Sequence, residues 1–108
     1  MPRPRRCRRI FFEPDVTYFK PAGVRMYHLE EIILTLDELE AIRLIDIEET
    51  EQGKAAKQME ISQPTLSRLL KSARKKIADA LINGKAIKVE GGNYKFMKQR
   101  GFRRRKYL

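Results

Sequence analysis

The chain has 108 residues, a formal net charge of +10 at pH 7, one cysteine and no tryptophan. This length supplies one modest hydrophobic core, so we expect a single small domain. One cysteine excludes a disulfide within the chain and fits a reducing cytoplasm. No apolar stretch approaches the roughly 20 residues that span a bilayer, and no signal-peptide pattern follows the basic start, so we expect a cytoplasmic protein without membrane contact.

The positive charge is concentrated at the two ends of the chain. Residues 1–12 contain five arginines, residues 95–108 contain seven basic residues, and neither segment contains an acid. The middle is divided, because residues 30–60 hold ten acids and three bases whereas residues 61–94 hold two acids and seven bases. Basic segments of this kind indicate a polyanionic partner such as DNA, RNA or an anionic membrane. We therefore expect a basic N-terminal arm over 1–12, a domain over 13–94 and a basic tail over 95–108.

The N-terminal part lacks helical periodicity. Residues 1–9 combine five arginines with two prolines and predict an extended segment. Two short β-like runs follow at 9–12 and 16–19, separated by Glu13, Pro14 and Asp15. We expect these runs to lie along a helical core without forming a sheet of their own.

The first helix is predicted to start at Thr35 and to end near Ile47. Thr35 and Glu38 have the spacing of a capping box, in which each residue satisfies the backbone amide of the other. The acidic residues fall opposite the apolar ones, which predicts a solvated acidic face. The apolar side of this helix consists of Leu36, Leu39, Ile42, Leu44 and Ile45.

Two more helices are predicted, the first from about Glu51 to Met59 with Thr50 as its N-cap. The second covers 63–83, with Ser62 as its N-cap, Pro64 tolerated in its first turn and Gly84 just beyond its end. Its apolar stripe is predicted to contain Leu66, Leu69, Leu70, Ala73, Ile77, Ala80 and Leu81.

After Gly84 the apolar period changes to two residues. Ile87 and Val89 alternate with charged residues before Gly91-Gly92, and Tyr94 and Phe96 alternate after it. This pattern predicts a small β-hairpin turning at the glycine pair.

Helices 51–59 and 63–83, joined by a short turn, have the pattern of a helix-turn-helix. The adjacent alanines of the first helix permit close helix crossing, and Ile61 can fill the corner. Ser62 is expected to leave the first-turn amides of the second helix pointing outward, where they favour a phosphate. Glutamine suits adenine and arginine suits guanine in the major groove. The candidate DNA contacts on this helix are Gln63, Pro64, Thr65, Ser67, Arg68, Lys71, Ser72 and Lys75, and Arg3, Arg5 and Arg6 of the arm join them.

The sequence gives little support for a metal site or an enzymatic site. A lysine-rich amphipathic helix alone is often only a solvated surface, and it is the combination with a capped turn and basic ends that favours DNA. Cys7 and His28 are the only soft metal ligands, whereas zinc sites normally need three or four. We expect no metal, no cofactor and no enzymatic activity.

The sequence resembles an uncharacterised family of small bacterial and archaeal proteins that are predicted to bind DNA through a helix-turn-helix similar to region four of sigma factors. The matching segments are residues 2–6, 8–9, 18–23, 36–46, 55–56, 61–65, 73–81 and 83–92. The resemblance implies a role in transcription, with helix 63–83 in the major groove. The chain has Gln52, Gly53 and Lys54 where related sequences usually carry an acidic pair.

Together these patterns predict a mainly α domain with a helix-turn-helix, a small C-terminal β-hairpin and basic arms, which binds double-stranded DNA and regulates transcription. An RNA- or ribosome-associated protein is the alternative, because basic ends do not distinguish the two nucleic acids. A module that contacts the transcription machinery through the acidic face is another. We also expect a homodimer, because two-fold pairing doubles the DNA contacts.

Overall fold

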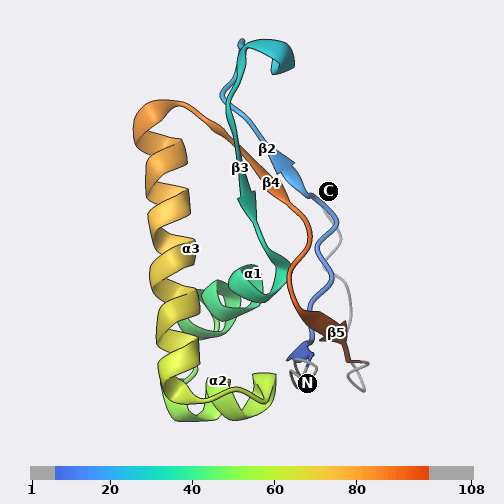
Figure 1. Cartoon of the computed structure of the whole chain (residues 1–108), viewed down its shortest axis with the longest axis vertical. Helices are drawn as coiled ribbons and strands as arrows, with labels where there is room; N and C mark the ends of the chain where they lie inside the picture. Colours follow the sequence, from blue (N-terminus) through green and yellow to red (C-terminus); the bar gives the residue numbers. More distant parts are fainter. Residues whose placement is uncertain (1–6, 98–108) are drawn as a thin grey trace, which may run out of the picture.

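The computed structural model describes residues 7–97, which form three α-helices and five short strands (Figure 1). The strands are β1 (Arg8–Ile10), β2 (Tyr18–Phe19), β3 (Glu31–Leu34), β4 (Ala86–Val89) and β5 (Tyr94–Phe96), and the helices are α1 (Leu36–Ile42), α2 (Gln52–Met59) and α3 (Gln63–Asn83). A 3-10 turn, η1 (Met26–His28), precedes β3, and a π-helical turn, η2 (Arg43–Ile47), continues α1. The mainly helical fold expected from the sequence needs correction, because the strands build two small sheets around the helices.

The strands pair across the whole length of the sequence. β1 is parallel to β5, with Arg8 opposite Tyr94. In the second sheet, β4 lies between β2 and β3, antiparallel to the first and parallel to the second. The N-terminal runs thus form no sheet of their own, as expected, but each joins a strand from the C-terminal part. Strand β3 was not anticipated.

The predicted hairpin is wrong, because β4 and β5 belong to different sheets. Gly91 and Gly92 do adopt left-handed backbone angles, with φ of 74° and 101°. However, the Gly91 carbonyl accepts a hydrogen bond from the Leu36 amide at 3.0 Å. A Cβ at Gly92 would lie 2.6 Å from the Asp37 carboxylate. The connection is therefore packed against the start of α1, and the chain continues onto β1 instead of turning back along β4.

The predicted helices are present, with two differences: the first is α-helical only to Ile42 and π-helical over Arg43–Ile47, and one cap changes. The Thr35 hydroxyl and Glu38 form both bonds of the capping box. Helix α2 is capped by Glu51 instead of Thr50, because the Glu51 carboxylate accepts from the Gly53 amide at 3.1 Å. A Cβ at Gly53 would lie 2.8 Å from that carboxylate, so a larger residue there would require the exposed Glu51 side chain to shift.

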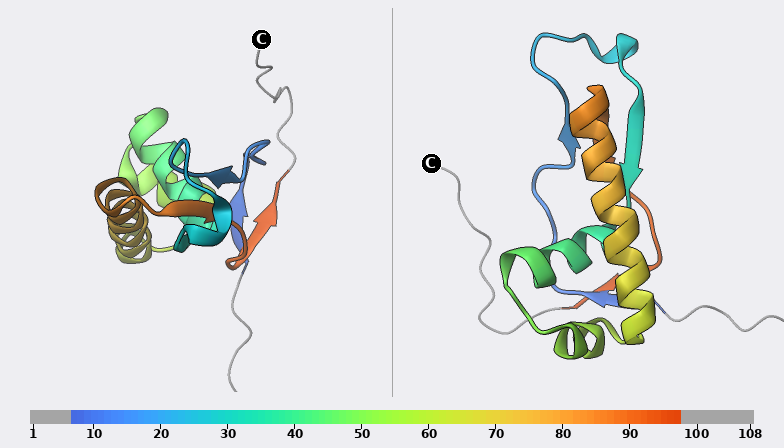
Figure 2. Two further views of the ribbon diagram at one scale, coloured as in Figure 1. Left: turned by 90° about the horizontal axis from the view of Figure 1, so that it is seen from above. Right: turned by 90° about the vertical axis from the view of Figure 1, so that its left-hand side faces the viewer.

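Helix α3 begins and ends as predicted. The Ser62 hydroxyl accepts from the Thr65 amide at 3.2 Å, and Gly84 ends the helix with φ of 66°. Helix α1 crosses the middle of α3, α2 lies beside its N-terminal end, and β4 returns along it (Figures 1 and 2).

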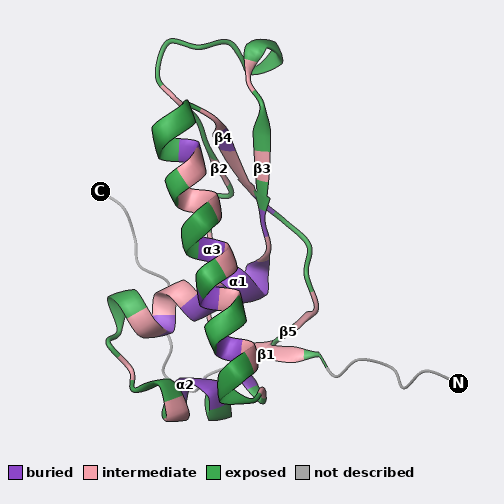
Figure 3. Cartoon of the chain, turned by 60° about the vertical axis from the view of Figure 1, so that its left-hand side comes forward, coloured by how far each residue is buried: buried purple, intermediate pink, exposed green. Residues whose placement is uncertain are grey.

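The core consists of two clusters on the inner side of α3 (Figure 3). One lies between α1, α2 and the N-terminal half of α3, and it includes Ala55, Met59 and Leu66. The other joins β1, β3 and β4 to α1 and Ala73. Leu81 was expected in the apolar stripe, but it is 76% exposed, because the last turn of α3 extends beyond both clusters.

Candidate nucleic-acid interface

Helices α2 and α3 are joined by a tight turn of three residues, 60–62. Glu60 takes a left-handed conformation with φ of 58°, and its amide donates to carbonyls of the last turn of α2. Ile61 is half-buried against the core, as expected for a residue that fills the corner. Ala55 and Ala56 are buried, which lets α2 pack closely against the neighbouring helices. The turn is thus held by backbone hydrogen bonds on one side and apolar packing on the other.

The first turn of α3 offers fewer free amides than expected. The Thr65 amide is bound by Ser62, the Leu66 amide donates to the Ser62 carbonyl at 3.0 Å, and Pro64 has no N–H. Of the first-turn donors, only the Gln63 amide remains for a phosphate. The expectation of several outward amides is therefore corrected to a single amide. The Ser62 hydroxyl donates to the Thr65 hydroxyl at 2.9 Å, which leaves the Thr65 proton available to a partner.

The outer face of α3 carries a row of unpaired cations. Arg68, Lys71 and Lys75 are exposed, and at about 100° per residue they fall within a narrow arc of the helix. Within residues 7–97, none of the three has a carboxylate at ion-pair distance. Ser67 is also exposed and lies on the same side. We call Ser67, Arg68, Lys71 and Lys75 the basic row.

The two remaining cations of α3 are neutralised from within the domain. The Arg74 guanidinium binds Asp46 through two nitrogens, at 2.6 and 3.3 Å. Lys76 lies 2.7 Å from the buried Glu38 carboxylate. These ion pairs attach the flanks of α3 to α1 and η2 and leave the outward face positive.

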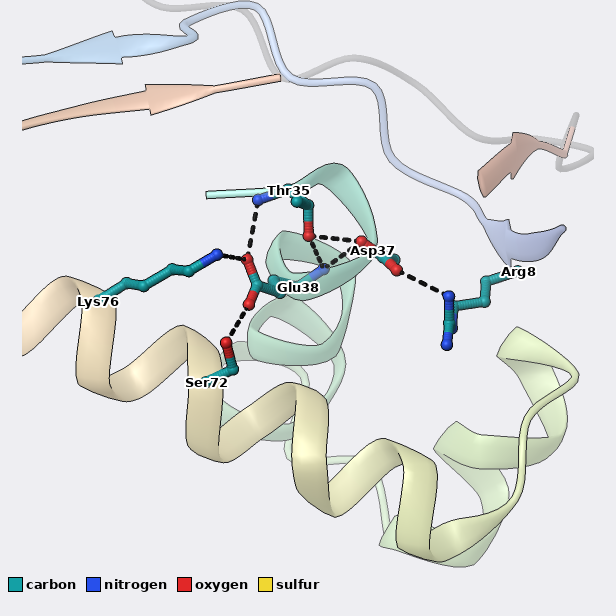
Figure 4. Close-up of polar contacts among 6 residues, drawn as sticks. All are labelled: Arg8, Thr35, Asp37, Glu38, Ser72 and Lys76. Atoms are coloured by element: carbon teal, nitrogen blue, oxygen red, sulfur yellow. Dashed lines mark hydrogen bonds and ion pairs between the residues drawn. The ribbon is translucent and has the colours of Figure 1, made fainter. Parts of the chain in front are cut away.

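Glu38 is the centre of a polar cluster between α1 and α3 (Figure 4). Its carboxylate accepts from the Thr35 amide, the Ser72 hydroxyl and Lys76. Burial favours the neutral form, but the hydrogen bonds outweigh burial and hold the pKa of Glu38 below its usual value. Ser72, a candidate DNA contact, therefore faces α1 and does not belong to the basic row.

Asp37 and Glu40 are also buried, which corrects the expected solvated acidic face of α1. Asp37 lies 3.2 Å from Arg8 of β1. Glu40 accepts from the Phe11 amide at 2.9 Å and pairs with Arg43 at 2.8 Å. These carboxylates hold the N-terminal segment against α1, and their burial is not visible in the helical period alone.

Strand β1 places part of the predicted basic arm inside the fold. Arg9 forms an ion pair with Glu60 of the α2–α3 turn, and Ile10 is fully buried. The ribbon of β1 and β5 thus lies next to that turn. The candidate contacts Arg3, Arg5 and Arg6, and the tail from residue 98 onward, lie outside the described residues.

Helix α2 adds two cations that are not among the predicted DNA contacts. Lys54 and Lys57 are exposed, on the side of α2 opposite the buried alanines. Their spacing of three residues puts them on one helix face, which was the signal available in the sequence.

Two findings concern other kinds of site. Within residues 7–97, no group of three or more histidine, cysteine, aspartate or glutamate side chains is arranged to hold a metal ion. None of the helices described is long and apolar enough to cross a membrane.

Comparison with known proteins identifies a family but no activity. A family model described as "Protein of unknown function DUF134" matches residues 1–97. A UPF0251 protein from Thermoanaerobacter sp. is 58% identical over 105 residues, which cover 95% of this chain and 93% of that protein. A UPF0251 protein from Caldanaerobacter subterraneus subsp. tengcongensis is 61% identical over 95 residues, which cover 88% of this chain and 80% of the relative. No solved structure matches the chain.

Proposed function

The chain belongs to this uncharacterised family, and we propose that it binds double-stranded DNA in a sequence-specific manner and regulates transcription. In this proposal α2 and α3 act as a helix-turn-helix similar to region four of sigma factors, with α3 in the major groove. No catalytic step is invoked, and the protein acts by binding.

The observation that supports this proposal is the distribution of charge around α3. Its flanking cations, Arg74 and Lys76, form ion pairs with carboxylates of the domain, whereas Arg68, Lys71 and Lys75 on the outer face have no carboxylate at ion-pair distance among residues 7–97. Lys75 lies close enough to Asp79 to contribute to the lowered pKa of that carboxyl, after its hydrogen bonds from Asn83 and Lys85. A helix that faces only solvent gains nothing from having its paired cations on the flanks and its unpaired cations on the outer face. A helix that faces phosphates gains affinity from this arrangement, because each unpaired cation can release a counterion from DNA.

The first turns of α3 would supply the base contacts. Gln63 and Arg68 are exposed near the capped end of α3. Their side chains can form bidentate hydrogen bonds, glutamine with adenine and arginine with guanine. Thr65 and Ser67 add hydroxyl donors, and the Pro64 ring is exposed beside them. Lys71 and Lys75 lie one and two turns further along and would position the helix through phosphates.

The ribbon of β1 and β5 would extend the phosphate contacts on both sides. Because these strands are parallel, the chain enters β1 at one end of the ribbon and leaves β5 at the other. The basic segments 1–6 and 98–108 are therefore attached at opposite ends of a ribbon that Arg9 ties to the α2–α3 turn. Lys54 and Lys57 of α2 would add contacts to the phosphate backbone of the DNA.

Selection of bound sites from random duplex DNA, followed by affinity measurements, tests the proposal. Arg68→Ala and Gln63→Ala are expected to change the preference among the selected sites, each by about 1–3 kcal/mol at one base position. Lys75→Ala serves as the matched comparison, since loss of a phosphate contact should weaken all sites about equally. Failure to enrich any sequence would refute specific binding.

The choice of nucleic acid is tested in the same assay. A structured RNA of equal length should compete less well than the selected duplex at matched salt, because α3 fits the DNA major groove and not the deep, narrow one of RNA. Equal or better competition by RNA would favour the alternative of an RNA- or ribosome-associated protein.

A further inference from the structure

The end of the molecule opposite the α2–α3 turn carries an unusual amount of exposed apolar surface. The chain between β2 and β3, residues 20–30, extends past the C-terminal end of α3 (Figure 1), and we call it the distal arm. Met26 and Tyr27 on this arm are 58% and 72% exposed. Leu81 and Ile82, in the last turn of α3, are 76% and 82% exposed.

A groove lies between the base of this arm and the end of α3. It has a volume of about 290 Å³ and a mainly apolar lining that includes Phe19, Pro21, Leu81 and Ile87, together with the lysines at 20 and 85. One chain therefore presents both a projecting apolar element and an apolar groove at the same end. A surface with both shapes can cover its own copy, since in a two-fold pair each arm can occupy the groove of the other.

The area of this surface is suited to a stable pair. The exposed fractions of Phe19, Val24, Met26, Tyr27, Leu81 and Ile82 add up to nearly four whole side chains. At roughly 150 Å² for each side chain, the lower end of the range for aromatic residues, these residues offer on the order of 560 Å² before any polar neighbour is counted. A standard protein–protein interface buries about 800 Å² on each partner. Isolated apolar residues on a monomer surface would not reach the area that these residues offer.

The charges along the distal arm are also self-complementary. Near its tip, Arg25 donates to the Tyr27 hydroxyl at 3.0 Å and has no carboxylate partner within residues 7–97. At its base, the Glu30 carboxylate is 80% exposed and lies 3.5 Å from Lys85, which is closer to Asp79. Antiparallel pairing of two arms about a two-fold axis brings the tip cation of one copy to the base acid of the other.

We propose that the distal arm and the groove form a two-fold interface through which two copies of this chain associate. Each copy places its arm tip, with Met26 and Tyr27, against the Leu81 side of the partner's groove. The interface lies at the opposite end of α3 from Gln63, so the basic row of each copy stays exposed. The association requires no DNA and is independent of the proposed function.

Sedimentation equilibrium of the full chain without DNA tests the proposal. The unaltered chain should show a concentration-dependent mixture of monomer and dimer at tens of micromolar. Leu81→Asp combined with Ile82→Asp should raise the dimer dissociation constant by roughly 30-fold or more, the loss expected for central interface residues. Both residues are exposed, so the variant should retain the circular dichroism spectrum of the parent. A monomeric unaltered chain at 100 µM would overturn the proposal.

Two further variants separate this interface from a general effect of added charge. Ile47→Asp changes an isoleucine that is 70% exposed at the end of η2, away from the arm, and should leave the dimer intact. Tyr27→Asp alters the arm and leaves the groove unchanged. A mixture of Tyr27→Asp and Leu81→Asp chains retains one unaltered arm–groove contact and should form more dimer than either variant alone. Equal dissociation by Ile47→Asp, or no recovery in the mixture, would overturn the arm-in-groove arrangement.

Discussion

Replacing the three unpaired cations of the basic row should change how DNA binding depends on salt. The affected residues are Arg68, Lys71 and Lys75, all changed to alanine in one variant. For duplex DNA, log K falls with log salt by about 0.9 for each phosphate that the protein neutralises. Arg68 is assigned to a base edge, so Lys71 and Lys75 are the two that meet phosphates, and the slope becomes shallower by about 1.8. Between 50 and 200 mM salt, the unaltered chain should therefore lose roughly 12-fold more affinity than the variant.

The structure supplies a control in which an arginine is removed from the same helix. Arg74 lies on the same helix but is bound to Asp46, so Arg74→Ala combined with Asp46→Ala removes an arginine without changing the net charge. This exposed pair contributes little stability, at most about 1 kcal/mol. The salt slope of the double variant should equal that of the unaltered chain.

The assay is fluorescence anisotropy of a labelled duplex, titrated at four or more salt concentrations, with circular dichroism to verify folding. The basic ends are the same in all three chains, so their contribution cancels in the comparison. Equal slopes for the unaltered chain and the triple variant would refute a phosphate role for the basic row. So would an effect of the Arg74 and Asp46 control as large as that of the triple variant.

Three other predictions concern stability and the basic tail. Glu38→Ala should lower the unfolding free energy by on the order of 2–3 kcal/mol, because Thr35 and Ser72 lose a charged acceptor. Since the pKa of Glu38 is lowered in the fold, its contribution to stability is present above the usual carboxyl pKa and is lost as pH falls through the folded value. Urea titrations at several pH values should therefore show that the unfolding free energy of the variant falls less steeply with acidification. Gly92→Ala should destabilise more than Gly91→Ala in thermal melts, because both have positive φ but only Gly92 would place its Cβ 2.6 Å from Asp37; equal melting temperatures would contradict the packing of this turn. Truncation after Met97 should weaken binding to all duplexes about equally and keep the fold, and a changed ranking of sequences would show that the tail reads bases.

The helices were predictable because their signals are local. Thr35 and Glu38 are three residues apart, and Ser62 and Gly84 mark the ends of α3 by side-chain chemistry that depends on immediate neighbours. The basic row could likewise be anticipated from spacing on one helix. The exposure of Leu81 could not, because its period matches the buried stripe and only the position of the surrounding elements leaves it uncovered.

The sheets and the buried acids were not predictable in the same way. β4 and β5 alternate like a hairpin, but their partners are strands from the other end of the chain, which a local pattern cannot specify. Asp37, Glu38 and Glu40 have the composition of an exposed helix surface. Each is buried because a partner distant in sequence reaches it, namely Arg8, Lys76 and the Phe11 amide. Ser72 is turned away from the basic row in the same manner, because its hydroxyl donates to Glu38.

The pairing of β4 and β5 with N-terminal strands has a consequence for how the chain folds as it is synthesised. β1, β2 and β3 emerge first, yet each finds its partner only after residues 86–96 have been made. Until then their backbone edges remain open, and such edges can associate with other chains. High contact order of this kind slows folding, since long loops must close before the contacts form. The helices, in contrast, can form earlier, so the last fifth of the chain completes both sheets around a preformed helical unit.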